Sequence, residues 1–242
     1  MSQPTPRRGA PASPNNVVVV LLDSLNRHML GGYGGAEFET PNLDRFAADA
    51  VRFTRHYTGS LPCMPARHDI LCGALDFLWR AWGSVEIWED ALTYALRNKG
   101  VVTQLISDHP HLFETGGENY HTNFTAWDYQ RGHEGDAWKT RPDRSWVGAP
   151  SFGRGWMPYD NSRGWFRDEA NFPGPKTMTA AMRWIDENAG AHNSRNPLTL
   201  FVWGSCRCAD LRLEARLGVG CSLKSHGSSR EAFAGFASAE LL

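Results

Sequence analysis

The sequence predicts an α/β fold in which a mixed, mostly parallel β-sheet is flanked by helices. Two observations carry this prediction. Apolar segments typical of strands alternate along the chain with amphipathic segments typical of helices. The first apolar segment, residues 17–22, is β-branched and apolar on both faces, as a buried parallel strand requires. A chain of 242 residues, 41% of them hydrophobic, is long enough to bury the core of one such domain.

The expected elements begin after a short leader. Residues 1–16 are rich in Pro, Ser and Arg, so we expect them to be disordered. The strand over residues 17–22 ends in Asp23, at a position where a loop begins. Thr40 and Pro41 then provide the cap and the first residue of a helix whose apolar face continues to Val51.

The middle of the chain provides two further helices and a strand. A second helix is predicted from Pro65 to the glycine at position 73, and a third from Glu89 to Lys99. Gly100 ends the third helix, and the apolar residues 101–106 then predict a strand.

The last third of the chain is predicted to be less regular. Residues 127–175 are rich in Trp and Gly, which indicates a long surface excursion. An amphipathic helix follows over residues 176–188, and a final strand over residues 198–203. Because strand and helix alternate from residue 17 to residue 204, we treat this segment as one domain.

Composition excludes several classes of function. The 25 basic and 26 acidic residues give no electrostatic basis for binding nucleic acid or an anionic membrane. The longest apolar run, residues 17–22, is far shorter than the ~20 residues that cross a bilayer. No apolar segment of a secretory signal follows Arg7 and Arg8, and the five cysteines lack the spacing of a disulfide framework. We therefore expect a cytoplasmic protein.

Asp23 is the first candidate site residue. In open α/β sheets, ligands bind beyond the carboxyl ends of the strands, where this side chain is expected to project. A carboxylate at that place suits a hard divalent cation. The alternative is an ordinary aspartate that caps a helix or stabilises a turn.

Cys63 and Arg67 are the second candidate pair. If Pro65 is the first helical residue, Cys63 lies just before a helix N-terminus, where free N–H groups favour an anion. Arg67 lies one turn into the helix and can reach back towards position 63. A nucleophile, an anion-binding helix start and a guanidinium together suit attack on a tetrahedral oxyanion ester. The alternative is a buried structural cysteine.

These residues also carry a resemblance to a known family. Cys63-x-Pro65-x-Arg67 resembles the signature of type I sulfatases. The order of the surrounding segments is similar as well: a strand ending in Asp23, the sequence Gly-Tyr-Gly, and then Thr-Pro-Asn-Leu-Asp from position 40. The resemblance covers residues 16 to about 204, and related phosphonate monoester hydrolases share the same order.

The resemblance implies a fold and a mechanism. The fold would be that of the alkaline phosphatase superfamily. Cys63 would be oxidised to formylglycine by a formylglycine-generating enzyme, and one hydroxyl of the hydrated aldehyde would attack the sulfur of a small sulfate ester. Asp23 and the modified Cys63 would hold a divalent cation, Ca²⁺ above all, with Mn²⁺ or Mg²⁺ as alternatives. Arg67 would hold the diol and neutralise charge.

The sequence departs from the family pattern at two places. Many sulfatases have a second Asp after the first strand, where this chain has Ser24, which favours phosphonate or phosphate esters as an alternative substrate class. A Lys-x-His pair of the family aligns with His109, as a substrate-binding residue, and His111, as a catalytic residue. A rival interpretation treats Asp108 and His109 as the metal-binding Asp-His pair, which the family places much later in its sequence.

Weaker candidates lie between the two predicted strands. His121 is a candidate substrate-binding residue, and so is the polar run over residues 131–136, although ordinary loop residues explain both equally well. Cys72 falls on the helix that follows the motif and is expected to be a core residue.

The chain changes character after Trp203. Residues 205–242 contain no Trp, Tyr or Pro, whereas Arg outnumbers Lys by 21 to 4 in the chain as a whole. This composition suggests a shifted reading frame in GC-rich DNA, so we expect an aberrant tail and a sheet that is incomplete on its C-terminal side. A truncated, inactive remnant of the family is therefore an alternative to an active enzyme. Cys206, Cys208 and Cys221 form no complete zinc site.

Overall fold

Four parallel strands form the sheet of the computed structural model, which describes residues 16–76, 80–134, 136, 138, 168–188 and 197–205. The strands are β1 (Asn16–Asp23), β2 (Val102–Ser107), β3 (Ala126–Tyr129) and β4 (Leu198–Ser205). They lie in the order β1-β4-β2-β3, and each neighbouring pair is parallel. The predicted α/β fold with a parallel sheet is confirmed. No antiparallel strand, which a mixed sheet would need, occurs among the described strands.

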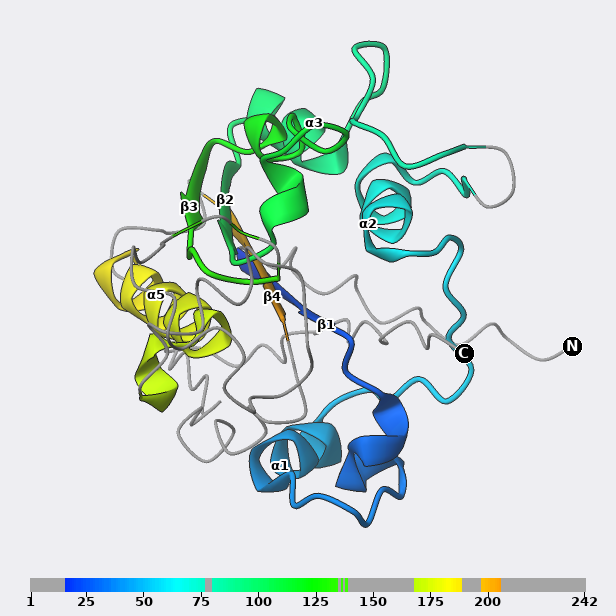
Figure 1. Cartoon of the computed structure of the whole chain (residues 1–242), viewed down its shortest axis with the longest axis vertical. Helices are drawn as coiled ribbons and strands as arrows, with labels where there is room; N and C mark the ends of the chain where they lie inside the picture. Colours follow the sequence, from blue (N-terminus) through cyan, green and yellow to red (C-terminus); the bar gives the residue numbers. More distant parts are fainter. Residues whose placement is uncertain are drawn as a thin grey trace, which may run out of the picture.

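Helices cover both faces of this sheet. The α-helices are α1 (Pro41–Asp49), α2 (Cys63–Cys72), α3 (Leu92–Asn98) and α5 (Pro173–Asn188). Short 3-10 helices are η1 (Arg27–Met29), η2 (Gly31–Tyr33), η3 (Pro110–Leu112), η4 (His121–Asn123) and η5 (Glu169–Asn171). Figure 1 shows α2 and α3 on one side of the strands and α5 on the other, with α1 set apart beside η2.

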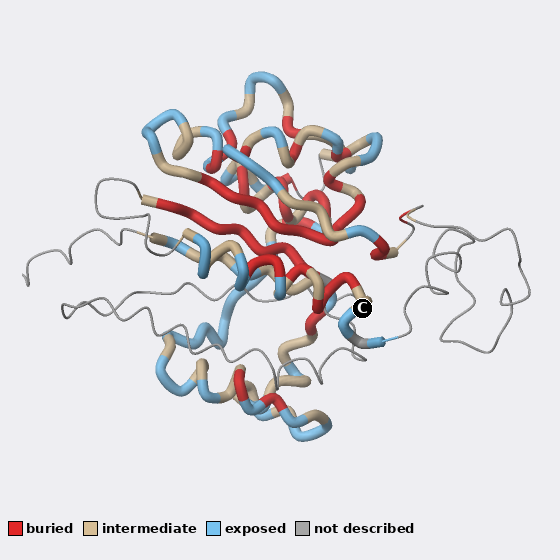
Figure 2. The backbone as a smooth tube through the Cα atoms, turned by 90° about the vertical axis from the view of Figure 1, so that its left-hand side faces the viewer, coloured by how far each residue is buried: buried red, intermediate tan, exposed pale blue. Residues whose placement is uncertain are grey.

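The core consists of two layers, one on each face of the sheet. Leu105, Phe201 and Trp203 pack with Met64 and Leu71 of α2. The residues that alternate with them pack instead with Ala180 and Ala181 of α5; these are Ile106, Leu200 and Val202. This alternation is the two-residue period of a strand that is covered on both faces. Buried backbone therefore runs through the middle of the molecule (Figure 2).

The first strand is less buried than its sequence predicts. Val17 is 41% exposed and Val20 is 44% exposed, although we expected both faces of this strand to be covered. The reason is position, because β1 pairs only with β4 among the described strands and so lies at one edge of that sheet. None of the described helices has the length and apolar character needed to cross a bilayer.

Some predicted boundaries were wrong by several residues. The second helix begins at Cys63 rather than Pro65, and α5 begins at Pro173 rather than Lys176. Proline fits any position in a first helical turn, where N–H groups have no partner within the helix, so it marks the start only loosely. The third helix begins at Leu92, because Glu89 lies in a turn whose N–H bonds to Glu86.

Of the other expectations on the fold, some are confirmed, one is wrong, and some concern residues outside the described part of the chain. Helix α1 begins at Pro41 as predicted, and Cys72 packs against the core. Strand β3 begins at Ala126 and runs into the segment that we expected to be irregular from residue 127 onward. The leader (residues 1–15), most of the Trp-rich excursion (residues 139–167) and the tail beyond residue 205 lie outside the described residues.

Candidate active site

Asp23 ends the first strand and faces the beginning of helix α2. Its Oδ2 lies 2.9 Å from Nη2 of Arg67, and its Oδ1 accepts a hydrogen bond of 3.1 Å from the Ser24 hydroxyl. Ser24 has a φ of 62°, in the left-handed region that non-glycine residues seldom adopt. The chain thus turns sharply after β1 and leaves the carboxylate at the carboxyl end of the sheet, where the sequence places it.

Cys63 is the first residue of helix α2 and is half-buried. Burial raises the pKa of its thiol to about 11, more than the nearby Arg67 cation lowers it. The thiol is therefore protonated at neutral pH. A cysteine that acts directly as a nucleophile needs the opposite shift, so the unmodified side chain is a weak nucleophile.

Arg67 lies one helical turn beyond Cys63, as the motif predicts. Its side chain is 3% exposed, and its guanidinium packs over the ring of Trp203 at 5.7 Å from the centroid. Its Nε is buried without a hydrogen-bond partner among the described residues. A fixed cation therefore stands between the end of β1 and the beginning of α2, ready to hold an oxyanion.

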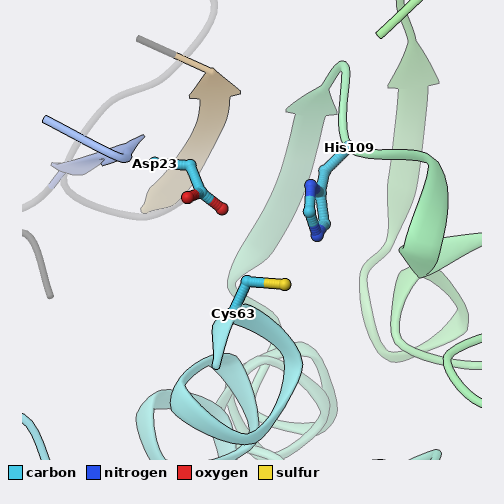
Figure 3. Close-up of side chains that lie close together, drawn as sticks. All are labelled: Asp23, Cys63 and His109. Carbon is cyan, nitrogen blue, oxygen red and sulfur yellow. The ribbon is translucent and has the colours of Figure 1, made fainter. Parts of the chain in front are cut away.

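His109 completes the group from the end of β2. The close-up in Figure 3 shows its ring and the side chains of Asp23 and Cys63 converging from β1, α2 and the loop after β2. Each of the three offers a ligand atom, and these atoms lie within 4.8 Å of one another. Burial, together with Arg67, lowers the pKa of His109 well below its ordinary value, so the imidazole is neutral.

The rival interpretation, in which Asp108 and His109 form a metal-binding pair, is supported for only one of the two residues. His109 lies in the group with Asp23 and Cys63, whereas the buried Asp108 is not part of it. The carboxylate and the imidazole that converge here thus come from two different strand ends.

His111 lies beside His109 but is engaged by carboxylates. The two rings are 5.0 Å apart, and Nε2 of His111 is 3.0 Å from Oε2 of Glu134. A second contact joins its Nδ1 to Glu114. Hydrogen bonding to Glu134 raises the pKa of His111 above its ordinary value, and Glu114 adds to the effect. The carboxylates therefore favour the protonated form of the His111 imidazole, next to the buried neutral ring of His109.

His121 does not join this group. Its Nδ1 lies 3.0 Å from the carbonyl oxygen of Leu112, and its ring contacts Phe113 and Trp127. Its described contacts are those of a residue that packs a loop against β3. Sequence position alone made it a candidate for substrate binding.

Glu134 is the site residue that the sequence undervalued, because ordinary loop residues explained its run equally well. It lines a cavity of about 680 Å³ together with Asp23, Cys63 and Arg67. The rest of that cavity is largely apolar and includes Val19, Leu21, Ile70, Leu92 and Phe201. Contacts from His111 and His133 lower the pKa of Glu134 far below its ordinary value, although burial opposes them. The carboxylate is ionised beside the candidate nucleophile.

Similarity to known proteins is concentrated in the segment that holds these residues. The sulfatase family model matches residues 15–171. Arylsulfatase G of Mus musculus is 31% identical over 125 residues, which make up 48% of this chain and 23% of that protein. N-acetylgalactosamine-6-sulfatase of Rattus norvegicus is 43% identical over 67 residues, or 28% of this chain and 13% of that protein. The chain spans less than a quarter of these curated relatives.

Several solved structures also match. One is described as a complex with its substrate D-glucosamine-2-N,6-O-disulfate; its TM-score is 0.49 at 16% identity, over 78% of this chain and 34% of that chain. The phosphonate monoester hydrolase of Agrobacterium radiobacter has a TM-score of 0.47 at 17% identity, over 80% of this chain and 41% of that chain. In both cases the matched part is less than half of the solved chain.

Proposed function

This chain belongs to the sulfatase family, whose model matches residues 15–171, and on that premise we propose that it carries the nucleophile half of a site for hydrolysing sulfate monoesters. The observation that supports this most directly is the meeting of Asp23, Cys63 and Arg67 at the carboxyl end of the sheet. Relatives that are named as sulfatases are similar to part of the chain.

We propose that Cys63 becomes the nucleophile only after oxidation to formylglycine by a formylglycine-generating enzyme. The raised pKa of the thiol agrees with this, because a protonated sulfur is a poor nucleophile. An aldehyde at this position is hydrated in water to a diol, which has one hydroxyl for attack and a second through which the sulfated intermediate breaks down.

Arg67 and the two histidines then have separate roles. Arg67 is a buried cation beside position 63 and would neutralise charge that builds on the ester oxygens. His109 is neutral and buried at the end of β2, so it can accept or donate one proton near the ester. His111 would add positive charge beside it, because Glu134 and Glu114 raise the pKa of His111 and so favour its protonated form.

The residues present fit a divalent cation at Asp23, although they make only part of a ligand set. Asp23 provides the one carboxylate of the group, next to position 63 and His109. A cation bound there would act as a Lewis acid on the ester oxygens. Ca²⁺ prefers six or more oxygen ligands, and Mn²⁺ or Mg²⁺ are the alternatives. The identity of the ion and the expected cytoplasmic location stay predictions.

An assay with two aryl esters tests this proposal. The chain is co-expressed with a formylglycine-generating enzyme, supplied with Ca²⁺, and given an aryl sulfate and an aryl phosphonate monoester. Turnover of the sulfate supports the proposal. Preference for the phosphonate favours the related hydrolase activity. The presence of Ser24 in place of a second Asp also favours that alternative. No turnover of either ester by chain carrying the aldehyde favours an inactive member of the family.

A further inference from the structure

A tight loop after β3 presents two metal-binding side chains towards the end of β2. Asp136 holds this loop, because it accepts hydrogen bonds of 2.7 Å from both the Arg131 side chain and the Gly132 backbone. Glu134 has a φ of 49°, a left-handed conformation that is strained for a residue with a side chain. The fold thus maintains a strained turn at the point where His133 and Glu134 approach His109.

The spacing of the donor atoms suits one ion. His109, His133 and Glu134 each offer a ligand atom, and these atoms lie within 4.8 Å of one another. Nε2 of His133 is 3.4 Å from Oε1 of Glu134. Two ligand atoms on one tetrahedral zinc ion lie about 3.3 Å apart, as follows from bonds of about 2.0–2.1 Å. Small rotations of the three side chains would therefore bring them around an ion.

An unpartnered nitrogen provides an independent observation. His109 is 1% exposed, and its Nε2 has no hydrogen-bond partner among the described residues. An unpartnered buried polar atom costs about 1–3 kcal/mol. Its ring lies 6.3 Å from the ring of His133, measured between centroids. A bound ion would satisfy this nitrogen.

We propose that His109, His133 and Glu134 bind a divalent transition-metal ion such as Zn²⁺, at a site separate from the cation expected at Asp23. Two imidazoles and one carboxylate are the ligands that zinc prefers, whereas Ca²⁺ prefers oxygen alone. His111 supports the site from behind, because its Nε2 lies 3.0 Å from the second oxygen of Glu134.

The site has a consequence for the proposed reaction. His109 also belongs to the group with Asp23 and Cys63. An ion held by His133 and Glu134 would therefore also coordinate the His109 imidazole, which would then not be available to the ester. The binding itself depends only on the three ligands and does not require the chain to be a sulfatase.

Cobalt serves as the probe, because its spectrum distinguishes nitrogen and oxygen ligands from sulfur. The full chain is titrated with Co²⁺ in excess Ca²⁺, which saturates the hard-cation site. We expect ligand-field bands without a thiolate-to-cobalt charge-transfer band. The variants His133→Ala and Glu134→Gln should each weaken Co²⁺ at least about tenfold, the loss common even for residues that merely support a metal ligand. The exposed His28 provides the control His28→Ala, which should bind like wild type.

Circular dichroism of each metal-free variant shows whether it has folded. X-ray absorption of the zinc-loaded wild type provides a second measurement that needs no variant, and we expect only nitrogen and oxygen neighbours. Absence of binding, a thiolate charge-transfer band, sulfur neighbours, or full affinity in both folded variants would each overturn the proposal. Because the readout is binding, these outcomes are independent of whether an ester is hydrolysed.

Discussion

Arg67 joins the first strand to helix α2: its Nη2 lies 2.9 Å from Oδ2 of Asp23, across 44 residues of sequence. The arginine is almost fully buried, and the aspartate side chain is 23% exposed. The pair therefore fixes the distance between the expected cation ligand and the helix that begins with Cys63. The distance between Asp23 and Cys63 therefore depends on the contact between Asp23 and Arg67.

Replacing Arg67 by Met should destabilise the fold by about 3 kcal/mol, since removal of one partner leaves a partly buried charge unpaired. Denaturation in urea measures this as a lower midpoint. The control is Arg183→Met, whose partner Glu187 is 64% exposed and whose own side chain is 70% exposed. An exposed pair of this kind contributes less than about 1 kcal/mol. Equal losses in the two variants would contradict a special role for the Arg67 contact.

Of the two described cysteines, only Cys63 should be needed for turnover. After co-expression with the maturation enzyme, Cys63→Ala should abolish hydrolysis of an aryl sulfate, because alanine has no thiol that can be oxidised to the aldehyde, so the attacking hydroxyl never forms. Cys72→Ala should keep turnover and lose only about 1 kcal/mol of stability, because Cys72 packs against the core. The two rates and the two unfolding midpoints check this. Turnover that survives in Cys63→Ala would show that another group attacks.

Removal of divalent cations should stop turnover and leave the chain folded. EDTA treatment followed by Ca²⁺, Mn²⁺ or Mg²⁺ in turn identifies the ion that restores the rate. Asp23→Asn should raise the concentration needed for half-maximal recovery at least about tenfold, because a neutral amide is a weaker ligand for a hard cation. The exposed Asp186 gives the matched control Asp186→Asn, which should recover like wild type. Recovery of Asp23→Asn at wild-type concentrations would place the cation elsewhere.

Stability should fall in acid partly because of Glu89. Burial opposes it, but hydrogen bonds from Glu86, His68 and Arg80 lower the pKa of Glu89 from 4.5 to about 2. Since the folded pKa lies below the unfolded one, this stabilisation is present above pH 4.5 and is lost as the pH falls towards about 2. Glu89→Gln should therefore flatten the fall of the urea midpoint over that range. The exposed Glu187→Gln should keep the wild-type slope, and parallel curves for all three proteins would refute the assignment.

The sequence predicts the parts of the site that lie at the ends of regular elements. The apolar run places Asp23 at the carboxyl end of a strand, and the proline at position 65 places Cys63 and Arg67 at a helix start. That the three meet in one site was implied by the resemblance to sulfatases. His109 was expected to bind substrate, and the structure places it with Asp23 and Cys63.

Other features depend on contacts between distant segments. Glu134 could not be assigned, since its place depends on a left-handed turn and on partners such as His111 that no local pattern reveals. Strand β3 was missed because it has only four residues, two exposed and two half-buried, at the edge of the described sheet, and they show no alternating pattern. The exposure of β1 depends likewise on strand order, which a run of valines does not encode.

The mass of the tryptic peptide over residues 56–67 tests the central proposal most directly. This peptide holds Cys63 and ends at Arg67. After co-expression with a formylglycine-generating enzyme, we expect the peptide to carry an aldehyde in place of the thiol, and to react with a hydrazine probe. A peptide that keeps an unmodified thiol, while a known sulfatase in the same cells is converted, would contradict a formylglycine nucleophile at position 63.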